Sequence, residues 1–166
     1  MSNSQNLIAE LEHELISTRK LLELVPAELI DFKPNPKAMA LGQLANHVAV
    51  IPFRYLSFAE KGFTDLEELI HHHEPKTKAE FLNNFKAGSE KAKLLLKNID
   101  HEWQGKSWSL TKNGSPVFTL PIELFIRLLV FNHFYHHRGQ LSAYLRALNV
   151  PLPSIYGPSA DENPFA

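Results

Sequence analysis

The chain has 166 residues, 44% hydrophobic and 21% charged, so it is long enough to bury a core of ordinary size. Seventeen Lys and Arg against eighteen Asp and Glu give a formal net charge of -1, and no basic cluster favours nucleic acid or an anionic membrane as a partner. The absence of cysteine excludes disulfides, thiolate metal ligands and an intrinsic thiol nucleophile.

The first six residues are polar, whereas a signal peptide begins with a basic end followed by an apolar core. No apolar stretch approaches the roughly 20 residues that a membrane-spanning helix requires. We therefore expect a cytoplasmic protein that forms one domain over residues 1–166.

The first predicted helix covers residues 6–25, where apolar or small residues recur at helical spacing and Pro26 provides a stop. The histidine within it, His13, lies off the apolar stripe and is expected in solvent. Residues 31–37 contain two prolines and are predicted to form a connector.

The second predicted helix covers residues 39–59. Its apolar seam includes Leu44, Ile51 and, at the same spacing, His47. Pro52 lies in its middle and is expected to kink it, because proline lacks the N–H that an interior helical position donates.

Residues 60–75 are polar and contain three consecutive histidines, at positions 71–73, which cannot share one helical face and are expected in a mobile loop without a native role. Thr77 and Glu80 then match a capping box, so a third helix is predicted from there to about residue 98. Gly88 in its centre would let a neighbouring helix come close.

Polar and apolar residues alternate on both sides of Asn113-Gly114, which predicts a short β-hairpin within residues 103–120. Pro116 confines the second arm to a sheet edge. Trp108 is expected to pack on the helices.

The last predicted helix runs from Pro121 to about Leu148, and close packing is the expected reason for Gly139 within it. His133 and His137 are four residues apart and therefore lie on one face, whereas His136 is rotated from His137 by about 100°. The residues of the predicted core seam are Ile126, Val130, His133, His137, Gln140, Tyr144 and Ala147.

Two imidazoles on one apolar face favour a metal over a pair of hydrogen-bonded core residues, because burying both without a ligand is costly. A third nitrogen is available from His47 on the second helix. Three protein ligands are typical of a catalytic metal that keeps positions open for water or substrate. The sequence therefore predicts a metal site formed by His47, His133 and His137, with His136 packed against a neighbouring helix, the hairpin or a partner.

These motifs resemble the DinB superfamily, also described as damage-inducible or YfiT-like metalloenzymes. The resemblance covers most of the chain and is carried by Leu41-Gly42-Gln43-Leu44-Ala45-Asn46-His47, His133-Phe134-Tyr135-His136-His137-Arg138-Gly139-Gln140-Leu141, Tyr144-Leu145-Arg146 and the tail from Val150 to Pro158. It implies an all-α, four-helix bundle of up-down-down-up topology, often dimeric. It also implies that His47, His133 and His137 bind a divalent ion such as nickel, zinc or iron.

Characterised branches of this superfamily include S-transferases and an isomerase that depend on low-molecular-weight thiols. Such a thiol is therefore an expected cosubstrate, and no catalytic residue is assigned. A metal-dependent hydrolase and a non-catalytic metal-binding stress protein remain alternatives. Hydrolysis would require a carboxylate as general base. None lies beside the two histidines of the last helix, although Asp161 and Glu162 in the tail could approach the site.

Three large aromatic residues, Phe125, Phe131 and Phe134, lie outside the predicted seam of the last helix. Exposed aromatic surface of this size would favour association with a second copy. A homodimer is therefore expected.

Overall fold

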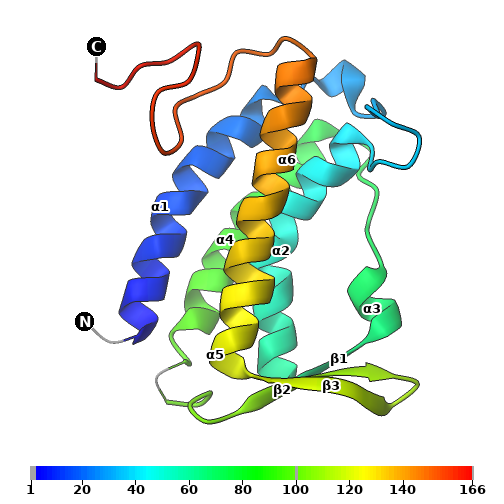
Figure 1. Ribbon diagram of the computed structural model, residues 1–166, viewed down its shortest axis with the longest axis vertical. Coiled ribbons are helices and arrows are strands. Elements are labelled where there is room, and N and C mark those ends of the chain that lie inside the picture. Colours follow the sequence, from blue (N-terminus) through cyan, green and yellow to red (C-terminus); the bar gives the residue numbers. More distant parts are fainter. Residues whose placement is uncertain (1–2, 100, 166) are drawn as a thin grey trace.

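The structure is a computed structural model that describes residues 3–99 and 101–165. It is mostly helical, with a small three-stranded sheet at one end of the long helices (Figure 1). The long helical segments lie side by side and comprise α1 (Asn3–Leu24), α2 (Leu41–Lys61), α4 (Lys78–Leu96) and a last segment made of α5 (Ile122–Phe125), a π-helix (Ile126–Asn132) and α6 (His133–Ala147). Within the described ranges, no helix is both long and apolar enough to cross a membrane.

Helix α2 is the most buried of these helices and packs against both α4 and α6. The close approach of a neighbouring helix that was expected at Gly88 of α4 is made by α2, because a Cβ atom at Gly88 would lie 3.4 Å from Phe53 Cβ. The helix continues through Pro52 and ends at Gly62, whose φ of 76° suits a left-handed C-cap. A short 3-10 helix, Ala27–Leu29, lies between α1 and α2.

The predicted hairpin is confirmed by the antiparallel strands β2 (Ser107–Lys112) and β3 (Ser115–Pro121). The turn residues Asn113 and Gly114 have φ values of 52° and 77°, as a tight hairpin turn requires. Strand β3, which contains Pro116, is at the sheet edge, and the register shifts between the Thr111–Pro116 and Leu110–Phe118 pairs. The sequence did not predict β1 (Phe63–Asp65), which pairs in parallel with β2.

Trp108 joins the sheet to the helices, as predicted. Its side chain is fully buried, its ring centroid lies 4.4 Å from that of Phe125, and its Nε1 donates to Thr64 Oγ1 at 3.1 Å. A buried indole needs such an acceptor. The start of the last helical segment is thereby fixed against β1 and β2.

The last helical segment differs from the single α-helix predicted over residues 121–148. Seven of its residues form a π-helix, directly before His133. A π-turn contains an extra residue and rotates the residues that follow it. As a result, the buried face of α6 carries Phe134, Arg138, Leu141 and Leu145, while the predicted seam residues His133, His137 and Tyr144 are half-buried and Gln140 is exposed.

Two further predictions about this segment were wrong. Phe125, Phe131 and Phe134 are fully buried within the chain, so they provide no surface for a second copy. Gly139 is exposed, and a Cβ there would meet nothing within 4 Å, so close packing does not explain it.

Helix α3 (Leu66–Ile70) lies in the polar stretch 60–75, where the sequence predicted no helix, and a non-helical segment at residues 71–77 leads from it to α4. We call residues 71–77 the connecting segment. The cap predicted for α4 is confirmed in part, because Glu80 N donates to Thr77 Oγ1 at 3.3 Å. The Glu80 carboxylate accepts from Lys76 N at 2.8 Å instead of reaching back to the Thr77 N–H.

Candidate metal centre

Three histidines from two helices meet in one place. His47 comes from α2, and His133 and His137 come from the first turns of α6. Each offers one ring nitrogen, and these atoms lie within 4.8 Å of one another. His47 Nε2 is 3.2 Å from His133 Nε2. The structure therefore brings together the three side chains that the sequence singled out, in a group that could hold a metal ion.

The spacing of the nitrogens fits a metal. Two nitrogens that are each about 2.0–2.1 Å from a tetrahedral ion lie about 3.3 Å apart. The observed 3.2 Å between the Nε2 atoms of His47 and His133 is close to that value. Nitrogen ligands of this kind suit zinc, nickel and iron alike, so the spacing does not select one of them.

Gln140 orients one of the three rings. Its Oε1 atom is 2.7 Å from His137 Nδ1, one helical turn away, and an amide oxygen can only accept. The proton of neutral His137 is therefore on Nδ1, and Nε2 keeps the lone pair that a metal needs. Partners of this kind fix the tautomer of histidines that bind metals.

Burial keeps the histidines neutral. Desolvation, together with the neighbouring His137 and His133, lowers the pKa of His47 to about 2. Desolvation and the nearby His137 lower the pKa of His133 to about 4, and desolvation is also the main cause that lowers the pKa of His137. At neutral pH these rings are uncharged and have lone pairs available for a metal.

Two buried ring nitrogens in this region lack a hydrogen-bond partner among the described residues. They are the Nδ1 atoms of His47 and His72. A buried polar atom without a partner costs about 1–3 kcal/mol, so such atoms are rare and each one needs an explanation, of which a bound ion or water is one.

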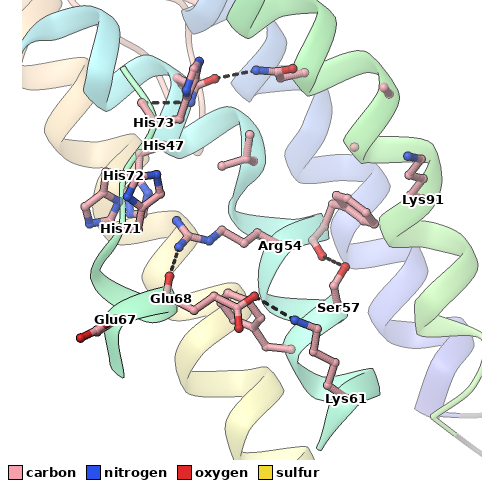
Figure 2. A pocket seen from close by; sticks show the side chains of 17 residues that line it. His47, Arg54, Ser57, Lys61, Glu67, Glu68, His71, His72, His73 and Lys91 are labelled. Atoms are coloured by element: carbon pink, nitrogen blue, oxygen red, sulfur yellow. Dashed lines mark hydrogen bonds and ion pairs between the residues drawn. The ribbon is translucent and has the colours of Figure 1, made fainter. Parts of the chain in front are cut away.

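His72 is the residue that sequence reasoning missed. The run at positions 71–73 was expected to be a mobile loop without a role, but the ring centroid of His72 lies 4.5 Å from that of His47 (Figure 2). No periodic pattern could have indicated this position, because the connecting segment is not helical. Its only sequence signal was the presence of the histidines themselves.

His136 is separate from the group, as its helical position predicted. Its ring contacts that of His137, with centroids 4.9 Å apart, but it does not belong to the group of three. The side chain is exposed, whereas packing against another element was expected.

The acidic residues of the tail are bound elsewhere, so the suggestion that they approach the histidines was wrong. Asp161 accepts from Leu152 N at 2.9 Å and pairs with Arg146, and Glu162 accepts from Ser154 N at 2.8 Å. Arg146, which holds Asp161, is nine residues beyond His137, so the pair lies about 13 Å farther along the helix than the histidines. Among the residues described, no carboxylate belongs to the group of three histidines.

A pocket of about 920 Å³ lies beside His47, between α2, α4 and the chain that includes α3 and the connecting segment (Figure 2). His47 and His72 form part of its wall. Its lining carries charges of both signs, from Arg54, Lys61 and Lys91 and from Glu67 and Glu68, and Phe53 and Phe58 are among its apolar residues. The pocket is large enough for a small-molecule substrate.

The geometry defines a helical protein with a three-histidine site that could hold a metal, next to a pocket of ligand size. The family model for the DinB family matches residues 1–163. The chain therefore belongs to the DinB family.

Solved structures of other proteins share this fold. A DinB-like protein from Bacillus subtilis is 16% identical, with a TM-score of 0.69 over 90% of this chain and 96% of the other. A DinB-like protein from Bacillus cereus is 21% identical, with a TM-score of 0.65 over 92% and 97% of the two chains. At these identities the likeness establishes the fold alone. No curated protein matched the chain in sequence.

Proposed function

We propose that the protein binds a divalent metal ion through His47, His133 and His137 and uses it to activate a thiol cosubstrate for transfer to an electrophile. The observation that carries this proposal is the set of three ring nitrogens within 4.8 Å of one another. Three protein ligands leave at least one coordination position for a reactant, whereas a closed structural site normally has four.

A divalent ion in this position would lower the pKa of a bound thiol or water and so supply a nucleophile near neutral pH. Residues of the chain would orient the ligands and hold the substrate. Gln140 holds His137 in the tautomer that exposes Nε2. The buried aromatic ring of Tyr55, with its centroid 4.8 Å from that of His133, limits the movement of that ligand. The neighbouring pocket would hold the substrate.

Thiol transfer is favoured over hydrolysis by the residues around the histidines. A hydrolase would use a carboxylate to accept a proton from water, and in the described part of the chain no Asp or Glu joins the group. A thiol reaction would need an external thiol, because the chain has no cysteine. The alternatives are a metal-dependent hydrolase and a non-catalytic metal-binding protein.

The remaining expectations accompany this proposal. We propose a four-helix bundle of up-down-down-up topology, forming one domain and located in the cytoplasm. The homodimer also remains a prediction, now without the support of the three phenylalanines, which are buried. Light scattering across a concentration series tests it, and a constant monomer mass contradicts it.

The metal is tested with tag-free protein, dialysed against zinc or nickel and then against metal-free buffer. Elemental analysis is expected to find about one ion per chain, and His133→Ala is expected to lose it. His13→Ala is the matched control, because His13 is exposed on α1 and should keep full occupancy. Wild-type protein that retains no stoichiometric ion contradicts the proposal.

The loaded protein is then assayed with small thiols and electrophiles. Turnover that requires both the metal and the thiol supports the transferase. Turnover without thiol supports the hydrolase, and tight metal binding without turnover of any tested pair favours the non-catalytic alternative.

A further inference from the structure

We propose that His72 is a fourth ligand of the metal, which closes the site in the resting protein and is displaced when the cosubstrate binds. The inference rests on the proposed function, and it assigns a role in regulating access to the same site.

The ring of His72 is already placed beside the group. Its centroid lies 4.5 Å from that of His47, with the rings nearly perpendicular at 86°. The corresponding distances within the group are 4.4 Å for His47 and His137 and 4.5 Å for His133 and His137. His72 is therefore as close to His47 as the members of the group are to one another.

One nitrogen of His72 has no other role in the described structure. Although the side chain is only partly buried, its Nδ1 atom is enclosed and has no hydrogen-bond partner. The two neighbouring histidines differ. His71 is exposed, and His73 Nε2 is 2.5 Å from Glu80 Oε1. Of the three consecutive histidines, only His72 combines proximity to the group with an enclosed and unpaired nitrogen.

Hydrogen bonds on both sides of His72 fix the chain there. Before it, the Arg54 guanidinium donates to the carbonyl oxygens of Glu68 and Leu69. After it, Asn46 Nδ2 donates to the His73 carbonyl oxygen at 3.4 Å. Asn46 directly precedes His47, so one turn of α2 holds both a member of the group and the backbone next to His72.

The nitrogens of His72 are not part of the set within 4.8 Å, so the ring must move inward to bind the same ion. The backbone is fixed by the hydrogen bonds on either side, and a rotation of the side chain is the smallest movement that achieves this. Side chains change rotamer far faster than helices rearrange.

A site with four imidazoles has the ligand number of a closed zinc site, whereas three leave a position open. Exchange of His72 for a thiol breaks one metal–nitrogen bond and forms one metal–sulfur bond, and the thiol proton passes to solvent. Because His72 lines the pocket, a cosubstrate bound in the pocket would be next to the displaceable ligand. The protein would thus expose the reactive ion only when the pocket is filled.

The test compares zinc-loaded wild-type protein with His72→Gln, and His71→Gln serves as the matched control from the same segment. X-ray absorption spectra without thiol should show four imidazoles in the wild type and in the control, and three in His72→Gln. The zinc dissociation constant should rise at least about tenfold in His72→Gln, and the control should stay within about twofold of wild type.

Addition of a small thiol should convert the wild-type spectrum to one sulfur and three imidazoles. A wild-type site with three imidazoles, and equal zinc affinity in the two variants, would overturn the role of His72 and leave the proposed function intact. Wild-type protein that binds no zinc would overturn both. The wild-type spectrum decides the ligand number even if a variant fails to fold.

Discussion

Arg138 and Glu14 form an ion pair between α6 and α1, with Arg138 Nη1 2.5 Å from Glu14 Oε2 and side chains that are only 3% and 8% exposed. Arg138 also donates to the Glu14 carbonyl oxygen at 3.2 Å and to Thr18 Oγ1 at 3.3 Å. Tyr156, from the tail, donates to Glu14 Oε2 at 2.8 Å. Because Arg138 directly follows His137, this buried network fixes the rotation of α6 on which the histidine group depends.

Removing one partner of this pair should strongly destabilise the protein. Glu14→Ala leaves the Arg138 charge buried and uncompensated, which typically costs about 3–5 kcal/mol. Urea unfolding measures the loss. The control is Arg19→Ala, which breaks the exposed 2.8 Å pair with Glu23 and should cost less than about 1 kcal/mol. Similar losses in the two variants would contradict the importance of burial.

The two adjacent histidines of α6 should respond differently to substitution. His137→Gln is expected to lose the metal, because it removes a member of the group, whereas His136→Gln should keep near-normal occupancy. Elemental analysis after identical loading and dialysis measures both. Equal losses in two well-folded variants would show that His136 also contributes to the site.

Substitution of Gln140 should lower the affinity for the metal without removing a ligand. Gln140→Leu deletes the acceptor of the His137 Nδ1 proton, and losses of such partners typically reduce metal affinity about 10–100-fold. A competition titration with a chelator provides the measurement. Gln140→Glu retains an acceptor at the same place and should restore most of the affinity. A wild-type affinity in Gln140→Leu would exclude the positioning role.

The metal-free protein should lose stability as the pH falls below about 6.5. The pKa of His47 is lowered to about 2 and that of His133 to about 4 in the folded state. Between an unfolded pKa of about 6.5 and these values, the unfolded chain binds more protons, so the free energy of unfolding decreases by up to about 1.4 kcal/mol per pH unit for each group.

Urea unfolding at pH 7 and pH 5 measures this dependence, with a chelator present throughout. The double variant His47→Gln and His133→Gln is the control and should show a smaller decrease. Identical decreases in the wild type and the double variant would mean that these two histidines are not protonated on unfolding.

The histidine group could be predicted from sequence because each of its members lies at a regular helical spacing. His47 follows Leu44 and precedes Ile51 on the buried face of α2, and that face was correctly assigned. The buried face of α6 was assigned wrongly, because the π-helix before His133 changes the rotation of the residues after it. A spacing rule for an α-helix cannot anticipate an inserted residue.

Two other features had no readable pattern. Glu14 is buried on α1 although charged residues are rarely placed in a core, and its contacts with Arg138 and Tyr156 explain this position. Strand β1 has three residues, too few to show an alternation, and it forms because β2 offers it a partner. Both depend on contacts between residues far apart in the chain.

The separation of His47 and His133 along the chain has a consequence for folding. These two residues are 86 positions apart, and an ion bound to both would act as a reversible cross-link that closes a loop of that length. In the unfolded chain, a permanent link over such a loop removes conformational entropy worth about 4–5 kcal/mol. A bound ion would thus join the second and last helices by a connection that a chelator can open and close without cutting the chain.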